Sequence, residues 1–406
     1  MKYIILIGDG MADYPVEELG GRTPLEVADI PNMNLIAQKG RLGLVRTIPV
    51  GFTPGSDTAN LSILGYNPKK YYTGRAPLEA ASIGLELGRD DVAFRCNLVT
   101  LSVKDGITCM DDFSAGHIST EEAKELIRNI DRELGTEDIR FCPGVSYRHL
   151  MVWEKGYEGM ATTPPHDISG RPIASHIPKG KGERRIIELM NDSERVLESN
   201  PINLKRIEES KKPANSIWLW GQGKAPKMPT LMERYGISGS VISAVDLIKG
   251  IGIYAGLDVV NVPGATGYLD TNYRGKADYA LRELEEKDFV YLHVEAPDEA
   301  AHSGNLKEKI KAIERFDKEV VGTVLNGVDG FRGYRIMALP DHSTPLTVMS
   351  HTADPVPFVI YSSDDRETTP SKDLGFNEKS AERNGVYVEE GHELLSSFLE
   401  GKRAGT

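Results

Sequence analysis

Short, uninterrupted runs of apolar residues recur along the chain. The first, Lys2–Gly8, reads KYIILIG, and comparable runs follow at 216–220, 240–244, 259–262, 289–294, 334–339 and 357–361. Such runs are typical of strands that a parallel sheet buries on both faces. Between several of them, apolar residues recur with helical spacing, at 245–255, 276–284 and 305–325. This alternation predicts an α/β fold, a doubly wound sheet with helices on both faces.

The middle of the chain has a different pattern. Short strands are predicted at 94–101 and 147–153, polar or charged helices at 119–134 and 183–198, and a Pro/Gly-rich loop at 162–182. We interpret residues 88–214 as a smaller α+β domain inserted into a discontinuous first domain of residues 1–87 and 215–406. An inserted domain of this kind is suited to act as a substrate-binding lid that excludes water.

Composition and charge restrict the class of partner. The 406 residues carry a net charge of −12, which argues against a nucleic-acid partner because such partners favour a basic face. A small anion remains compatible, since bound metal ions reverse the local field. No run approaches the roughly 20 apolar residues of a membrane span. The cysteines Cys96, Cys109 and Cys142 show no CxxC or metal-site spacing, so we expect reduced thiols in a cytoplasmic protein, with a disulfide as the alternative.

Metal-binding residue types follow several of the predicted strands. They are Asp9 after the first run, Asp298 and His302 after 289–294, and Asp341, His342 and His351 after 334–339. Ligands in open α/β sheets bind beyond the carboxyl ends of the strands, and Asp298 and His302 share one helix face. Singly, each piece has a plain structural explanation, such as a turn aspartate or a surface Asp–His pair. Together they predict a centre for divalent cations, which carboxylates and imidazoles suit.

Ser56 lies in the segment TPGSDT, just before a helical pattern at 59–64. One explanation is an ordinary helix cap. The other is a nucleophile whose hydroxyl is deprotonated by a metal and attacks a phosphate at the helix N-terminus. Two divalent cations and the three aspartates would leave one net positive charge, enough to attract a phosphate monoester. The sequence contains no GxSxG motif, so an esterase-type triad has no support.

With these residues in view, the chain resembles the alkaline phosphatase superfamily and, within it, the archaeal-type 2,3-bisphosphoglycerate-independent phosphoglycerate mutases. The resemblance covers nearly the whole chain, through GDGMAD (8–13), TPGSDTANLSILGY (53–66), DDFSAGHIS (111–119), WLWGQGKAP (218–226), VISAVDLIKGIG (241–252), HVEAPDEAAH (293–302), LPDHSTP (339–345) and HTADPVPFVIY (351–361). It implies an alkaline-phosphatase-like fold. It also implies an isomerase of glycolysis and gluconeogenesis that interconverts 3-phosphoglycerate and 2-phosphoglycerate through a phosphoserine, without 2,3-bisphosphoglycerate.

The resemblance implies a role for each matching residue. Ser56 would be the nucleophile, with Asp9, Ser56, Asp341 and His342 around one metal ion and Asp298, His302 and His351 around the other. Manganese is favoured, with cobalt, magnesium or zinc as alternatives. His117 and Lys224 match positions near the reacting phosphate, and Arg148 is a candidate for the glycerate carboxylate, which a guanidinium binds with two hydrogen bonds. Each of these three has an alternative as a solvated surface side chain.

Two other functions compete with the mutase. A phosphohydrolase, or a phosphotransferase with another acceptor, would use the same metals and serine on another small phosphate ester. A binding or scaffold protein would need no catalytic set, yet all seven residues are present. The sequence allows a homo-oligomer without defining its size.

Overall fold

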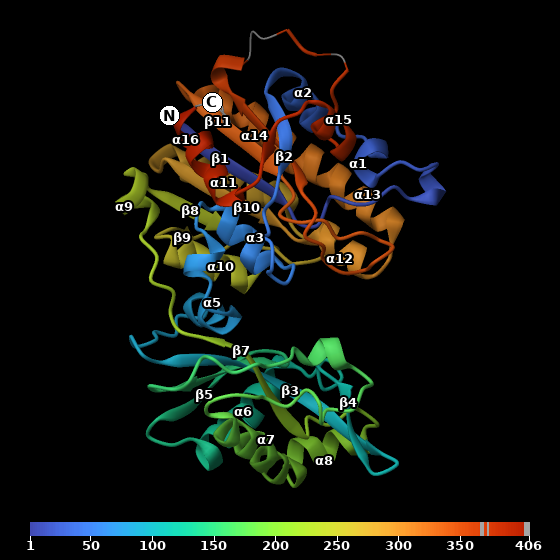
Figure 1. The fold of residues 1–406 in the computed structure, drawn as a ribbon, viewed down its shortest axis with the longest axis vertical. Coiled ribbons are helices and arrows are strands. Elements are labelled where there is room, and N and C mark those ends of the chain that lie inside the picture. The colour runs from blue at the N-terminus through green and yellow to red at the C-terminus, as the bar shows by residue number, and fades with distance from the viewer. Residues whose placement is uncertain (366–368, 372, 402–406) are drawn as a thin grey trace. The chain divides into compact units, whose positions relative to one another are not determined.

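The computed structural model describes residues 1–365, 369–371 and 373–401. The chain divides into two compact units: unit 1 comprises residues 1–72 and 227–406, and unit 2 comprises residues 73–226 (Figure 1). The insertion expected at 88–214 begins later and ends earlier than unit 2. Helix α5 (Arg75–Ser82) accounts for the difference at one end, because it packs on strands of unit 2. Strand β7 (Ser216–Gly223) accounts for the other, because it pairs with β3 (Val92–Lys104) of unit 2.

In the described part of the chain, unit 1 is built on an eight-stranded sheet of order β13-β2-β12-β11-β1-β10-β8-β9. Its strands are β1 (Lys2–Gly8), β2 (Arg41–Val45), β8 (Gly239–Ile242), β9 (Asp258–Val259), β10 (Phe289–Val294), β11 (Tyr334–Leu339), β12 (Val356–Ser362) and β13 (Tyr387–Val388). Strand β1 runs parallel to both β10 and β11, whereas β12 is antiparallel to its neighbours. The carboxyl ends of β10, β1 and β11 therefore lie side by side.

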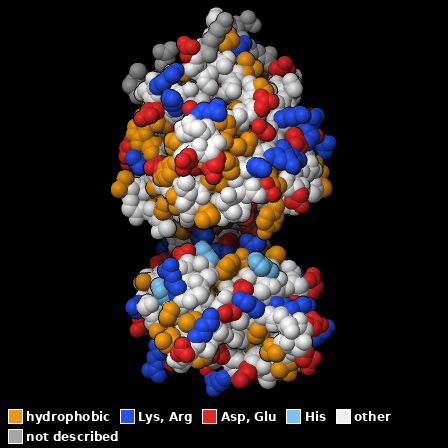
Figure 2. All heavy atoms as spheres, turned by 90° about the vertical axis from the view of Figure 1, so that its right-hand side faces the viewer, with side chains coloured by type: hydrophobic (Ala, Val, Ile, Leu, Met, Phe, Trp, Pro, Cys, Tyr) orange, Lys and Arg blue, Asp and Glu red, His pale blue; other side chains and the backbone are white. Residues whose placement is uncertain are grey.

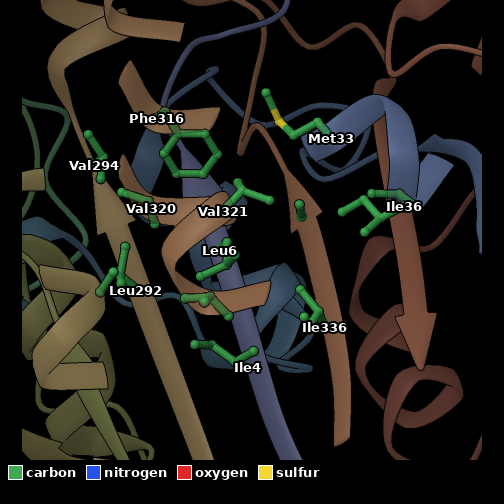
Figure 3. Packing of buried hydrophobic residues seen from close by; sticks show 14 of the residues in the cluster. Ile4, Leu6, Met33, Ile36, Leu292, Val294, Phe316, Val320, Val321 and Ile336 are labelled. Atoms are coloured by element: carbon green, nitrogen blue, oxygen red, sulfur yellow. The ribbon is translucent and has the colours of Figure 1, made fainter. Parts of the chain in front are cut away.

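Helices cover both faces of this sheet, which confirms the predicted α/β class. On one face, Ile4 and Leu6 pack among side chains of α2, α11 and the π-helical segment η3 (Phe316–Val321) (Figure 3). On the other, Tyr3 packs edge-on against Phe398 of α16. The helices of unit 1 are α1 (Pro24–Val27), α2 (Pro31–Lys39), α3 (Ser56–Ile63), α4 (Pro68–Tyr71), α9 (Leu231–Tyr235), α10 (Asp246–Tyr254), α11 (Tyr273–Glu286), α12 (Ala296–His302), α13 (Leu306–Arg315), α14 (Gly322–Gly327), α15 (Glu378–Arg383) and α16 (Leu394–Glu400).

The apolar runs locate most of these elements but not their partners. The runs at 2–8, 289–294 and 334–339 coincide with β1, β10 and β11. The run at 216–220 becomes β7, which joins the antiparallel sheet of unit 2 and not the parallel sheet that the pattern suggests. The helix expected at 305–325 is α13 and α14 joined by a π-helical segment, η3 (Phe316–Val321).

Unit 2 is an α+β unit with a five-stranded sheet. Its strands are β3 (Val92–Lys104), β4 (Ile107–Asp112), β5 (Ile139–Val145), β6 (Arg148–Trp153) and β7, and its longer helices are α6 (Thr120–Leu134), α7 (Glu183–Glu198) and α8 (Pro201–Glu208). Phe94, Cys96 and Leu98 of β3 join the hydrophobic core that also includes side chains of α6 and α7. Because side chains alternate along a strand, Arg95 and Asn97 lie on the opposite face. Across the described residues of both units, each helix is too short or too polar to cross a lipid bilayer.

Candidate active site

Neighbouring strands deliver the predicted metal-binding residues to one edge of the unit 1 sheet. Asp9 follows β1 directly, Asp298 and His302 lie on α12 just after β10, and Asp341 and His342 follow β11. Ser56 is the first residue of α3, and His351 lies in the loop before β12. The structure therefore brings all seven predicted residues together in unit 1, as the distances below establish.

Four of the seven form a group that we call the inner set, in which Ser56 is half-buried and the other three are buried: Asp9, Ser56, Asp341 and His342. Nε2 of His342 lies 3.1 Å from Ser56 Oγ, 3.4 Å from Asp9 Oδ1 and 3.5 Å from Asp341 Oδ2. The side chains of Asp341 and His342 are fully buried, and that of Asp9 is 3% exposed. One hydroxyl, one imidazole nitrogen and two carboxylates thus converge on a small volume.

The other three residues form the outer set: Asp298, His302 and His351. Nε2 of His302 lies 3.1 Å from Asp298 Oδ2 and 2.9 Å from His351 Nε2, which is itself 3.5 Å from the same carboxylate oxygen. His302 Nδ1 lies 3.0 Å from the carbonyl oxygen of Met349. A carbonyl can only accept, so Nδ1 carries a hydrogen, and Nε2 of the neutral ring offers its lone pair to the set.

The inner and outer sets are contiguous. The rings of His342 and His351 lie 4.1 Å apart between centroids. One ligand atom each from Asp298, His342 and His351 also falls within a mutual distance of 4.8 Å. His342 makes its closest contacts with the inner set but lies within reach of both, so the two sets constitute one centre.

Ser56 does not cap its helix, which contradicts the simpler explanation of the TPGSDT motif. The N-cap position of α3 is Gly55, and no side chain hydrogen-bonds there as a cap. The Ser56 hydroxyl instead faces His342. Asn60, one turn later, donates from Nδ2 to the Ser56 carbonyl and to Asp341 Oδ2, both at 2.8 Å. The helix start thus holds the hydroxyl against His342, whose Nε2 also faces the two carboxylates.

Two residues of this centre escape prediction from the sequence. Asn60 lies inside a helical pattern, and His293 lies inside the apolar run of β10. His293 Nε2 is 3.1 Å from Asp9 Oδ2, in a geometry that makes no hydrogen bond, and one atom each of Asp9, His293 and Asp341 lies within 4.8 Å of the others. A histidine within an otherwise apolar strand is the available signal for this residue.

The charges of the centre fit divalent cations. Among the described residues, the ion-pair partners of Asp9, Asp298 and Asp341 are histidines and not lysines or arginines. Burial, and then the charges of Asp341 and Asp298, raise the pKa of Asp9 well above its usual range, and its Oδ1 has no hydrogen-bond partner. Burial opposes ionisation of His302, but the hydrogen bond with Asp298, the negative charge of Asp298 and the hydrogen bond with the Met349 carbonyl together outweigh burial and raise the pKa of His302 to about 9. In the metal-free protein, His302 therefore binds a proton, and a metal ion can compete with that proton for the imidazole ring.

The predicted substrate contacts lie in unit 2. His117 and Arg148 are both exposed and both contact Tyr147: the His117 ring lies 6.3 Å from the tyrosine ring between centroids, and the guanidinium carbon lies 5.5 Å from that ring. Lys224 follows β7 and forms ion pairs with Asp90 at 3.7 Å and Glu158 at 3.9 Å. The structure thus brings His117 and Arg148 to one tyrosine, while Lys224 pairs with two acids.

Unit 2 also contains a basic group that the sequence did not reveal. The Arg95 guanidinium carbon lies 4.2 Å from the Trp220 ring centroid, and its Nε is 3.0 Å from Glu79 without a hydrogen-bonding geometry. Burial lowers the pKa of Arg95, and the charges of Arg75 and Arg148 act in the same direction while Glu79 opposes them. Figure 2 shows histidine side chains at the surface of unit 2 beside lysines and arginines. Arg95, which is buried, and Arg148, which is exposed, are planar donors of the kind that bind anionic groups.

Known proteins of one family match this chain. The family model for 2,3-bisphosphoglycerate-independent phosphoglycerate mutase matches residues 37–203. A probable enzyme of that name from Geobacter sulfurreducens is 56% identical over 98% of this chain and 100% of its own length, and one from Methanosarcina mazei is 54% identical over 98% and 100%. The solved structure of PH0037 from Pyrococcus horikoshii is 33% identical, covers 98% of this chain and 96% of its own, and has a TM-score of 0.82. The chain therefore belongs to the family of 2,3-bisphosphoglycerate-independent phosphoglycerate mutases.

Proposed function

We propose that this protein interconverts 3-phosphoglycerate and 2-phosphoglycerate through a phosphoserine at Ser56, with no need for 2,3-bisphosphoglycerate. The relatives that share more than half of its residues over their full length carry the name of that activity. The observation that carries the chemistry is the Ser56 hydroxyl, which lies 3.1 Å from His342 Nε2, the same atom that lies within 3.5 Å of two buried aspartates. A plain structural serine needs no such surroundings. We place the enzyme in the cytoplasm, where its cysteines would stay as thiols.

The two sets are suited to hold two divalent cations, the inner set one and the outer set the other. Mixed carboxylate and imidazole ligands are compatible with manganese, our first choice, and with cobalt, magnesium or zinc. When bound, such ions acidify a coordinated hydroxyl and stabilise negative charge on phosphoryl oxygens.

The residues of the chain account for the remaining chemistry. Ser56 Oγ attacks phosphorus, the bond from phosphorus to the glycerate oxygen breaks, and the proton that Ser56 loses is matched by one that the departing glycerate gains. The glycerate then turns, its other hydroxyl attacks the phosphoserine, and Ser56 recovers its proton. The N-terminus of α3 favours the phosphorylated serine, because its free amide groups attract an anion.

Unit 2 is our candidate for holding the substrate. Arg148 would bind the carboxylate with two hydrogen bonds, and His117 and Lys224 would contact the phosphate. The role of unit 2 as a lid that retains glycerate and excludes water is part of the same proposal.

Replacing Ser56 with alanine tests the proposal. We expect mutase activity to fall by at least about 10⁴-fold, because the residue that accepts the phosphoryl group is lost. Ser62→Ala is the matched control: Ser62 is buried on the same helix, its Oγ has no hydrogen-bond partner, and its loss should leave activity near that of the wild type. Substantial turnover by Ser56→Ala would exclude the phosphoserine route.

The products separate the mutase from a hydrolase. A coupled assay for 2-phosphoglycerate, run beside an assay for inorganic phosphate, should show isomer formation far exceeding phosphate release, with no requirement for added 2,3-bisphosphoglycerate. Phosphate release without isomer formation would assign the protein to the phosphohydrolases. A strict need for 2,3-bisphosphoglycerate would also contradict the proposal.

A further inference from the structure

One buried hydroxyl touches both ligand sets. Oγ1 of Thr344 lies 2.6 Å from Asp298 Oδ1, in the outer set, and 3.1 Å from His342 Nδ1, in the inner set. Thr344 is fully buried. Each of these two ligands uses another atom for its own set, since Asp298 presents Oδ2 to the histidines and His342 presents Nε2 to Ser56. Thr344 therefore contacts one ligand of each set, through the ligand atom that does not face the rest of that set.

The hydrogen-bond donors in this chain of contacts can be assigned. A hydroxyl has one hydrogen, and the carboxylate of Asp298 can only accept it. Oγ1 of Thr344 is then an acceptor toward His342, so Nδ1 of His342 carries a hydrogen. In the neutral ring, Nε2 therefore offers a lone pair toward the inner set. The single hydroxyl fixes the tautomer of one ligand and the orientation of the other.

The backbone of Thr344 is held in place by hydrogen bonds from Lys309 and to Ala12. Nζ of the fully buried Lys309 donates to the Thr344 carbonyl at 2.9 Å, to the Ala12 carbonyl at 3.2 Å and to Asp13 Oδ2 at 2.7 Å. The Thr344 amide donates to the same Ala12 carbonyl at 3.2 Å. Three donors of one ammonium group thus join the loop after β1 to the loop after β11, and the hydroxyl has little freedom to move.

Gly10 lies directly beside the Thr344 hydroxyl and the Asp298 carboxylate. It has a φ of +62°, and a Cβ placed there would lie 2.5 Å from Asp298 Oδ1 and 2.7 Å from Thr344 Oγ1. Only a residue without a side chain leaves room for the Thr344–Asp298 hydrogen bond. Lys309 and Gly10 therefore both help to preserve the Thr344–Asp298 hydrogen bond.

We propose that Thr344 is a positioning residue that couples the two cation sites, orienting one ligand of each through a single hydroxyl. The inference rests on the proposed function only in that the two sets hold ions. Outer hydrogen-bond partners of metal ligands typically change metal affinity by about 10- to 100-fold. A partner shared by two sets should change the affinity of both ions together.

Thr344→Val tests the proposal, because valine keeps the shape of threonine and removes its hydroxyl. Manganese is titrated calorimetrically into chelator-treated, full-length protein, and we expect both binding steps to weaken by about 10- to 100-fold. Thr344→Ser restores the hydroxyl and should bind manganese nearly as the wild type does. Thr100→Val is the control, since it removes a buried threonine hydroxyl that hydrogen-bonds Pro213 in unit 2; its manganese affinity should be unchanged even if its melting temperature falls.

Three results would overturn the proposal: unchanged manganese binding in Thr344→Val, weakening of only one step, or equal weakening in Thr344→Ser. Different outcomes would contradict the proposed function. Wild-type protein that binds two manganese ions but makes no 2-phosphoglycerate would remove the mutase assignment and leave the coupling intact, whereas protein that binds none of manganese, cobalt, magnesium and zinc would remove both.

Discussion

The inner and outer ligand sets lie side by side but are built differently. In the inner set, His342 is fully buried and Asp341 accepts hydrogen bonds from the Gly10 and His342 amides and from Asn60. In the outer set, the His302 side chain is 35% exposed and that of His351 is 20% exposed. The fold therefore fixes the inner set from several elements, while a helix and a loop present the outer set near solvent.

The two sets also differ in charge balance. The inner set has two aspartates and one histidine, and the outer set has one aspartate between two histidines. Without cations, the two carboxylates of the inner set share His342 in a buried place and their like charges repel, whereas the single carboxylate of the outer set has two histidines as partners. The inner set is thus a rigid part whose repelling charges favour a bound cation, and the outer set is a more accessible part whose single carboxylate already faces two histidines.

Removing one ligand from each set should give the largest contrast. Asp341→Ala should weaken inner-site manganese binding by more than about 100-fold, because the buried position admits no easy replacement ligand. His302→Ala should weaken the outer site by a smaller factor of about 10, since water can reach the vacated position. Calorimetric titration measures both, and equal losses would contradict the proposed difference in accessibility.

Removing the Asn60 side chain should weaken metal binding by the inner set alone, and by less than the loss of a ligand does. Asn60→Ala removes the donor to Asp341 Oδ2 and to the Ser56 carbonyl, so inner-site affinity should fall by about 10-fold while outer-site affinity stays unchanged. Ser303→Ala serves as the control, because that hydroxyl donates to the Ala300 carbonyl of the same helix. Weakening of the outer site by Asn60→Ala would show that the support is shared.

Charge removal should have opposite effects on the stability of metal-free protein. Asp9→Asn removes one of the repelling charges from a residue whose Oδ1 has no hydrogen-bond partner, so the free energy of unfolding should rise by about 1 kcal/mol. Asp298→Asn breaks contacts with two histidines and disturbs the Thr344 hydrogen bond, so it should lower that free energy by about 1 kcal/mol or more. Urea unfolding of chelator-treated proteins gives both values, and changes of the same sign would refute the contrast in charge balance.

The sequence predicted the strands that carry the site because buried parallel strands leave a strong local pattern. The runs that became β1, β10 and β11 place Asp9, Asp298 and Asp341 at adjacent strand ends, so their convergence followed from topology alone. The partner of β7 could not be predicted, because an apolar run does not specify which sheet buries it.

The parts of the site that were missed depend on contacts between distant segments. Asn60 and His293 lie within ordinary helix and strand patterns, and only the folded chain brings them to Asp341 and Asp9. Whether Ser56 capped its helix or faced the carboxylates was likewise undecided by local sequence, since Ser and Gly are both accepted at N-caps. In the structure, Gly55 occupies the N-cap position of α3, so Ser56 does not cap the helix.

Trapping the phosphorylated enzyme tests the central claim most directly. Protein loaded with manganese is mixed with 3-phosphoglycerate, quenched in acid within a single turnover and digested, and its peptides are mapped by mass spectrometry. The account predicts one phosphoryl group on Ser56, formed and lost at rates that match turnover. A fully active enzyme whose phosphoryl group resides on a histidine, or on no residue at all, would contradict it.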